Sequence, residues 1–283
     1  PTTYEGYVEG GDVSAKAKSY MIYQEGIYVG YKYYETRYED SILNPASGAS
    51  GTTGSSFGGG WNYAAEVTYP FGYGLSYTTF RYADMTAELR DGKITVTVTV
   101  ENTGSMAGAE VVQLYASRNQ NTAVFKAQKE LKAFQKIYLA PGEKKAVALV
   151  FEEQELAYYN TKTHSWVIEN GEYPILVGAS SQDIRLQGSA TVTGHQEAPA
   201  PYSAEAVAAY LEIAKKDIPD GVFSETIGRL IPAEPPIRPY TVESPISDYQ
   251  ASFMGRLLYN GFMKGIGGNP KKLDAMPEGT EKD

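Results

Sequence analysis

The sequence predicts a mainly β chain organised around one antiparallel β-sandwich, and three of its features lead to this fold class. Residues 93–102 alternate apolar and polar side chains at every second position, the pattern of a half-buried antiparallel strand. Asp91-Gly92, directly before this stretch, is typical of a hairpin turn and pairs it with a strand at 85–89. Short apolar runs then recur at roughly regular intervals up to about residue 194.

Turn residues such as Ala140-Pro141-Gly142 and Asn170-Gly171 separate several of these runs. Further strands are expected at 110–116, 131–139, 144–151, 165–168, 173–178 and 184–192. This succession predicts a sandwich of fibronectin type III or immunoglobulin-like shape over residues 85–194.

Residues 69–84 before the sandwich are predicted to form an aromatic connector. The stretch from Tyr69 to Phe80 holds five aromatic residues, two glycines and one proline, which is too punctuated for a helix and too bulky for a free linker. Gly72 and Gly74 allow a positive φ or a close backbone approach. We expect the large side chains, Phe71, Tyr73, Tyr77 and Phe80, to anchor the connector between two packed bodies.

Residues 1–68 are rich in Tyr and Gly and resemble an incomplete piece of a domain. The β-rich apolar run at 26–34 predicts a buried strand that turns into a loop, and residues 44–60 predict a mobile Gly/Ser-rich surface loop. Trp61 ends that loop and either anchors it or stacks on a sugar ring. Trp61 is therefore the candidate substrate-binding residue.

Residues 195–283 form a C-terminal extension that is predicted to wrap a larger body. Ser203 is expected to cap a helix that runs to about Asp217, and a second helix is expected over 248–263. The apolar face of the second helix would be formed by Phe253, Leu257, Leu258 and Phe262. Five prolines between residues 232 and 245 exclude a helix or a central strand there.

The composition of the 283 residues restricts the classes of partner. A net charge of −9 and a pI near 4.9 argue against nucleic acid or an anionic membrane surface, and leave neutral or sugar-like ligands open. The absence of cysteine excludes disulfides and thiolate chemistry and fits a cytoplasmic location slightly better than an oxidising one. No stretch approaches 18 apolar residues, so no membrane-spanning segment is expected. The opening Pro1-Thr2-Thr3 suggests a chain that begins within a larger gene product.

The residues offer little chemistry of their own. His164 and His195 are the only histidines, on an expected turn and a linker, so neither a metal site nor a cofactor is expected. Ser76 lacks the surroundings of a serine nucleophile and is expected to be a turn hydroxyl. The glycines at 58–60 lack the lysine and the helix of a phosphate-binding loop.

Glycoside hydrolysis requires two carboxyl groups on either side of a bound sugar. Glu35, Glu39 and Asp40 are crowded among aromatic residues, but we expect Glu35 and Arg37 to form structural ion pairs with neighbours. Glu39 and Asp40 are expected to form a solvated loop corner. The residues alone therefore predict no assembled active site in this chain.

Three blocks of sequence together resemble the C-terminal part of glycoside hydrolase family 3. They are GIYVGYKYYETRYED at 26–40, YPFGYGLSYTTF at 69–80, and a series of segments between 108 and 181 that includes KELKAFQKIYLAPGEKKAV and WVIENGEYPILVGASS. The tail around FMGRLL at 253–258 is similar to the C-terminal extension of bacterial members. The resemblance implies that residues 1–68 end an α/β sandwich domain and that 85–194 form the family's fibronectin type III-like domain.

The resemblance also implies a retaining, exo-acting β-glycosidase, most often a β-glucosidase, that acts on terminal β-linked sugars. The family's nucleophilic Asp and acid/base Glu belong to motifs that this sequence does not contain, so no catalytic residue is assigned to it. The expected partners are an N-terminal catalytic portion, as a separate or cleaved chain, and a β-linked oligosaccharide or glucoside. A non-catalytic carbohydrate-binding module and a structural or homo-oligomerising module are the alternatives.

Overall fold

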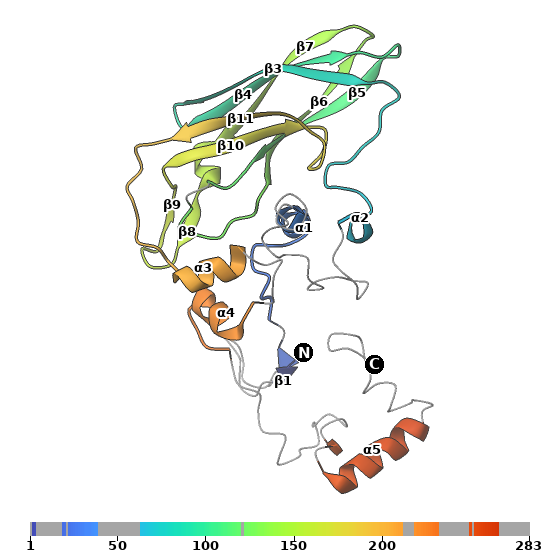
Figure 1. Ribbon diagram of the computed structural model, residues 1–283, viewed down its shortest axis with the longest axis vertical. Coiled ribbons are helices and arrows are strands. Elements are labelled where there is room, and N and C mark those ends of the chain that lie inside the picture. Colours follow the sequence, from blue (N-terminus) through green and yellow to red (C-terminus); the bar gives the residue numbers. More distant parts are fainter. Residues whose placement is uncertain are drawn as a thin grey trace, which may run out of the picture. The chain divides into compact units, whose positions relative to one another are not determined.

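Figure 1 shows the computed structural model of the chain. Its contacts divide the chain into two units. One unit is residues 23–231, the other is residues 1–22 together with 232–283, and each is described by itself. The structure describes residues 2–3, 19–20, 22–38, 63–119, 122–211, 218–231, 249–250 and 252–265.

The larger unit contains the predicted β-sandwich, made of two antiparallel sheets (Figure 1). One sheet has the strand order β11-β10-β5-β6 and the other has the order β3-β4-β7. The strands are β3 (Phe80–Arg90), β4 (Lys93–Asn102), β5 (Gly108–Ala116), β6 (Glu130–Leu139), β7 (Lys144–Glu152), β10 (Gly171–Gly178) and β11 (Ile184–Val192).

The core lies between the two sheets and follows the predicted alternation. Ile94, Val96, Val98 and Val100 of β4 are fully buried, whereas the threonines between them lie on the other face. The four-stranded sheet contributes buried residues to the same cluster, among them Val112, Leu114, Leu139, Ile175 and Val177. Burial of each such side chain stabilises the fold by about 1.5–3 kcal/mol.

Two strands differ from their predicted form. β3 begins at Phe80 rather than at 85, and its pairing with β4 shifts between Ala83 and Thr86, where Asp84 has a φ of 55°. The strand expected at 165–168 is β9 (Ser165–Val167), which pairs only with the short β8 (Tyr158–Asn160) and joins neither main sheet. The 3₁₀ turn η3 (Glu153–Leu156) connects β7 to this hairpin.

The prediction of a strand at 26–34 is wrong. Residues 23–30 form turns, and α1 (Tyr31–Tyr38) follows directly after Gly30, which has a φ of 58°. The tyrosines of this run favour a strand by propensity, but tertiary packing overrides that preference. The helix places Glu35, Thr36 and Arg37 in the interior. A short helix, α2 (Tyr63–Glu66), leads into the connector.

The helical start of the C-terminal extension is confirmed. Ser203 caps α3 (Ala204–Leu211), because its Oγ accepts a hydrogen bond of 3.1 Å from the N–H of Ala206. Tyr210 packs on Phe125 with ring centroids 4.1 Å apart and donates a hydrogen bond to the carbonyl of Gln24. A further helix, α4 (Asp220–Ile227), was not predicted.

The smaller unit contains α5 (Phe253–Gly265) and the two-residue strands β1 (Thr2–Thr3) and β2 (Ser19–Tyr20). α5 confirms the second predicted helix, and the four residues of its predicted apolar face are all exposed. No helix in the described ranges is long and apolar enough to cross a membrane. The loop predicted at 44–60 and the proline-rich stretch lie outside the described residues.

Candidate functional site

The connector between α2 and β3 crosses the four-stranded sheet and is held there by backbone carbonyls. Gln113 of β5 donates from Nε2 to the carbonyls of Gly72 at 2.9 Å and Ala179 at 2.6 Å. The N–H of Ser181 donates to the carbonyl of Phe71 at 2.9 Å. Gly72 has a φ of 78°, and a Cβ there would lie 1.9 Å from Oε1 of Gln113, so this position requires glycine.

The aromatic side chains of the connector anchor it only in part. Phe71 stacks on Tyr31 of α1 with ring centroids 4.0 Å apart, and Phe80 packs against the sandwich core. Tyr77 is 95% exposed and Leu75 is 87% exposed. The prediction that Tyr77 anchors the connector is therefore wrong within this chain. Its side chain lies on the surface because no described element packs over it.

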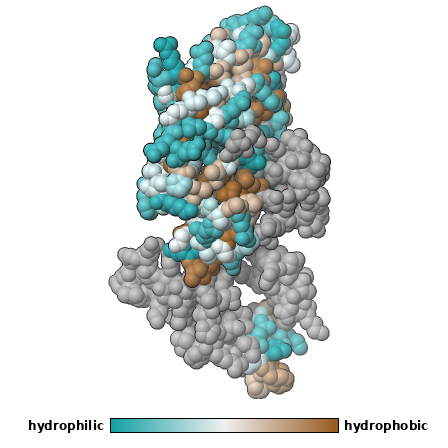
Figure 2. All heavy atoms as spheres, turned by 60° about the vertical axis from the view of Figure 1, so that its left-hand side comes forward, coloured by the Kyte–Doolittle hydropathy of each residue, from teal (hydrophilic) through white to brown (hydrophobic). Residues whose placement is uncertain are grey.

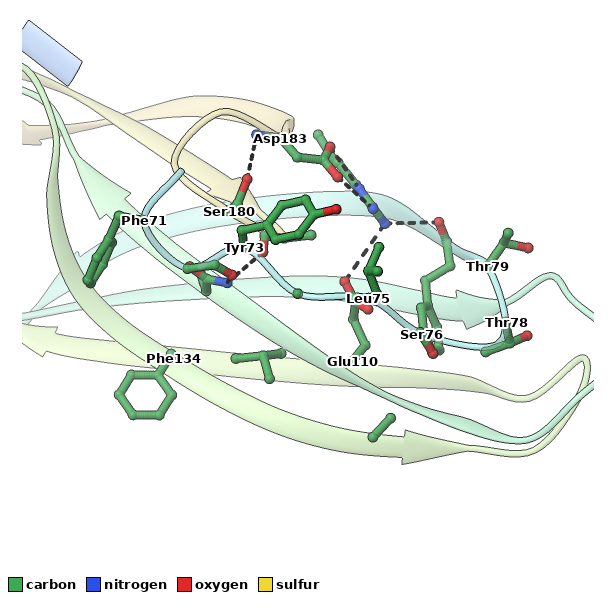
Figure 3. Close-up of a pocket in the computed structure, with 18 of the residues that line it drawn as sticks. Phe71, Tyr73, Leu75, Ser76, Thr78, Thr79, Glu110, Phe134, Ser180 and Asp183 are labelled. Atoms are coloured by element: carbon green, nitrogen blue, oxygen red, sulfur yellow. Dashed lines mark hydrogen bonds and ion pairs between the residues drawn. The ribbon is translucent and has the colours of Figure 1, made fainter. Parts of the chain in front are cut away.

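A groove of about 740 Å³ lies between the connector and the outer face of the sheet. Figure 3 shows Tyr73 and Leu75 of the connector across from Phe134 of β6, with Glu110 and Asp183 on opposite sides of the connector. Figure 2 shows that hydrophobic residues reach the surface of this unit in patches among hydrophilic ones. The groove thus combines apolar walls with the charged residues Glu110, Asp183 and Arg185.

Arg185 lies between the two carboxylates of the groove. Its guanidinium lies 2.8 Å from Oδ2 of Asp183 and 3.9 Å from Oε1 of Glu110, and it stacks over the ring of Tyr82. The hydroxyl of Tyr82 donates to Glu110 at 2.8 Å. Burial raises the pKa of Glu110, although the hydrogen bond from Tyr82 and the charge of Arg185 oppose that shift. Both carboxylates are committed to one cation, which suits a structural cluster better than an acid and nucleophile pair.

A second polar centre lies in the interior around Glu35 of α1, which is 1% exposed. Glu35 Oε1 accepts hydrogen bonds from Tyr63 Oη at 2.7 Å and Ser181 Oγ at 2.8 Å. Its Oε2 lies 3.1 Å from Nζ of Lys129 and also accepts a hydrogen bond from the amide of Gln182. These partners come from α2, the segment before β6, and the β10–β11 loop.

The Glu35 centre is structural in its geometry. Each of its oxygens accepts two hydrogen bonds, and Lys129 balances its charge, so the carboxylate has no lone pair directed at a described cavity. The expectation that Glu35 forms an ion pair with a neighbour is confirmed. Arg37, which is also buried, donates to the hydroxyl of Tyr33 at 2.9 Å.

The remaining sequence-predicted site residues are either undescribed or lie in separate places. Trp61, Glu39 and Asp40 lie outside the described residues. His164 sits in the turn between β8 and β9, and His195 contacts Glu153 at 2.7 Å. In the described part of the chain, no cluster of three metal-ligating side chains occurs. Sequence reasoning missed Glu110, Lys129 and Arg185, because they are ordinary charged residues within strands and loops and only the tertiary fold brings their partners to them.

Comparisons with known proteins agree with this architecture. Residues 110–181 match the model of the fibronectin type III-like domain. The chain is 39% identical over 174 residues to thermostable beta-glucosidase B of Acetivibrio thermocellus, which covers 60% of this chain and 20% of that protein. It is 37% identical over 168 residues to an exo-alpha-(1->6)-L-arabinopyranosidase of Bifidobacterium longum, which covers 59% of this chain and 19% of that protein.

Among solved structures, beta-glucosidase 3B of Thermotoga neapolitana, in complex with alpha-D-glucose, is 38% identical with a TM-score of 0.49. That match covers 62% of this chain and 20% of the other. The sandwich is a fibronectin type III-like domain, because residues 110–181 match the model of that family. The sequence matches confirm the resemblance of the chain to the C-terminal part of a glycoside hydrolase family 3 enzyme of the β-glucosidase type, and they span about a fifth of each relative's length.

Replacement of the buried carboxylate should destabilise the larger unit. Glu35→Gln leaves Lys129 without its counter-ion in the interior, and loss of one member of a buried pair costs about 3–5 kcal/mol. Urea unfolding followed by circular dichroism measures this loss. The exposed Glu172→Gln serves as a control and should change the free energy of unfolding by less than about 0.5 kcal/mol. Equal midpoints for the two variants would contradict the structural role of Glu35.

The raised pKa of Glu110 should make one part of the stability depend on pH. The native state binds the Glu110 proton at a higher pH than the unfolded chain, whose carboxyl has the ordinary value of 4.5. Stability from this group therefore falls as pH rises through the native pKa, by at most about 1.4 kcal/mol per pH unit. Between pH 7 and pH 4.5, wild type should gain stability relative to Glu110→Gln as pH falls, in paired urea titrations. A difference that stays constant, or that moves toward the variant, contradicts this assignment.

Proposed function

We propose that this chain is the non-catalytic C-terminal portion of a retaining, exo-acting β-glycosidase, with β-glucosidase as the favoured activity. The observation that carries the proposal is the 39% identity over 174 residues to thermostable beta-glucosidase B of Acetivibrio thermocellus. On this proposal the catalytic Asp and Glu belong to the N-terminal portion of the enzyme.

The proposal includes a division of the chain by role. Residues 1–68 would complete an α/β sandwich domain, 69–84 would connect, 85–194 would form the fibronectin type III-like domain, and 195–283 would wrap the body. The Glu35 centre supports this division, since it ties α1 and α2 to loops of the sandwich by buried hydrogen bonds. The chain would thus hold the α/β portion and the sandwich in one fixed relation.

The exposed part of the connector supports docking to the N-terminal portion. Leu75 and Tyr77 project from a segment whose two ends are held by packing and hydrogen bonds. Leu75, together with Phe134 and Val111, borders the apolar part of the groove, and Tyr77 lies outside it. Exposed apolar surface of this kind marks interaction sites, and a covering partner would remove it from water.

Activity should depend on both portions. The 283-residue chain alone should not hydrolyse an aryl β-glucoside, and coexpression with the N-terminal portion of a family 3 β-glucosidase as a separate chain should give activity and a stoichiometric complex by intact-mass analysis. Because the reacting carboxyls would lie on the other portion, hydrolysis by this chain alone contradicts the proposal.

In the active complex, Trp61→Ala should raise KM for a disaccharide if Trp61 stacks on the sugar, and unchanged kcat and KM would remove that role.

Charge placed on the connector should weaken the complex. Leu75→Asp puts a carboxylate into the proposed contact and should raise the dissociation constant by about tenfold or more, since a shift of 1.4 kcal/mol corresponds to a factor of ten. Leu230→Asp is a matched control, because Leu230 is 85% exposed and lies outside the groove. Analytical ultracentrifugation of the two portions measures the affinity. Equal affinities for both variants would exclude the connector as the docking surface.

A carbohydrate-binding role without catalysis is a second candidate. An exposed tryptophan next to a polar groove on the β8–β9 hairpin favours it. The two functions are compatible, because the hairpin and the connector use different residues of the same domain.

A further inference from the structure

The β8–β9 hairpin presents an aromatic pair on the surface of the sandwich domain. Tyr159 and Trp166 lie directly opposite each other in the hairpin and meet edge to face, with ring centroids 5.7 Å apart and an interplanar angle of 74°. Trp166 is nevertheless 65% exposed. Tryptophan is highly buried on average, so an indole that is oriented by a neighbour and left open to solvent is a feature that calls for a ligand.

A groove of about 400 Å³ runs beside this indole. One wall is β9 with the turn before it, and the other is the segment 195–199 that follows β11. Hydroxyl, amide and carboxylate groups border the groove at Thr163, Ser165, Gln196 and Glu197, and all four side chains are exposed. The groove therefore offers neutral and anionic hydrogen-bonding groups next to an aromatic face.

The walls of the groove are fixed before any ligand arrives. Asn160 donates to the carbonyl of Pro199 at 2.8 Å, and Lys162 donates to that of Ala200 at 2.7 Å. Asn170 and His195 exchange two hydrogen bonds, of 2.7 Å and 3.0 Å. These bonds join the hairpin and Asn170, the residue before β10, to the segment 195–200. A ligand would thus meet a preformed site and would lose little free energy to ordering it.

The chemistry of the groove selects among classes of ligand. Its lining includes the carboxylate of Glu197 and no lysine or arginine, and its one histidine is paired with Glu153. An anionic ligand such as a phosphate or a nucleic acid would be repelled. A pyranose ring has one face of C–H groups that packs on an aromatic ring and a rim of hydroxyls that require donors and acceptors. A neutral sugar satisfies both the indole and the polar rim.

We propose that Trp166, supported by Tyr159 and flanked by the groove along β9, is an accessory binding site for a pyranose unit of a neutral oligosaccharide. The site would hold a glycan without taking part in bond cleavage, which goes beyond the proposed role of the chain as part of a glycosidase. It lies entirely within the described sandwich domain and its following segment, so it does not depend on the N-terminal portion.

The sequence allows a direct test on the full chain, because it contains only two tryptophans. In a Trp61→Phe background, the single remaining indole N–H resonance of ¹⁵N-labelled protein reports on Trp166. Titration with cellopentaose should shift this resonance saturably, with a dissociation constant on the order of 1 mM. Trp166→Ala should weaken binding by about tenfold or more in saturation-transfer measurements on the ligand.

Matched variants distinguish specific binding at Trp166 from nonspecific binding of the sugar to exposed aromatic side chains. Tyr138→Ala removes an aromatic side chain of nearly equal exposure, 66%, from the outer face of β6 and should leave the affinity unchanged. Trp166→Phe should keep part of it, because a smaller aromatic face remains. An indole resonance that does not move with cellopentaose, or an affinity that survives Trp166→Ala, overturns the proposal.

A last measurement distinguishes a glycan from a protein partner. Addition of the N-terminal catalytic portion should leave Trp166 accessible to acrylamide quenching, and protection of its fluorescence would assign the indole to a protein interface and overturn the proposal. Failure of the glycosidase assay would count against the proposed function alone, because the titration needs no catalysis. In an active complex, Trp166→Ala should reduce retention on insoluble glucan and leave kcat/KM for a small aryl glucoside unchanged.

Discussion

The arrangement of the larger unit depends on one buried carboxylate. Glu35 accepts hydrogen bonds from residues of α2, of the segment before β6 and of the β10–β11 loop, and Lys129 supplies the opposite charge. Removal of a carboxylate from water is costly unless its oxygens are satisfied. Burial of Glu35 therefore requires that α2, the segment before β6 and the β10–β11 loop all lie in place around it. α1 can pack against the sandwich only when this is so.

The same constraint explains which parts of the fold could be predicted. The conformation of β4 could be predicted from its own sequence. Its apolar side chains alternate with polar ones over ten residues, and this alternation specifies which face of the strand is buried. The run at 26–34 carries no such period, and its aromatic residues favour a strand only by propensity. Its conformation is decided by where Glu35 and Arg37 are buried, which is information held by distant residues.

The functional sites could not be predicted either, because their residues are brought together from positions that are far apart in the sequence. A close approach to the backbone could be expected at Gly72 from its sequence. Nothing near it in the sequence identifies the side chain of Gln113 as the group that makes this approach. Arg185, Glu110 and Tyr82 come from three different strands, and each is unremarkable in its own segment. The alternation in β9 likewise does not reveal that its tryptophan stays outside the core, since that follows from the hairpin joining neither main sheet.

The bond between Tyr63 and Glu35 has a consequence for how this region can change in evolution. It joins the end of α1 to the start of α2, so the chain enters and leaves residues 39–62 at two points that the interior already holds close together. The entropy lost when the ends of a loop are fixed grows only with the logarithm of its length, by about 0.6 kcal/mol for each doubling. A longer or shorter connection between Glu35 and Tyr63 should therefore change the stability of the fold little, because the hydrogen bond that joins its two ends stays the same.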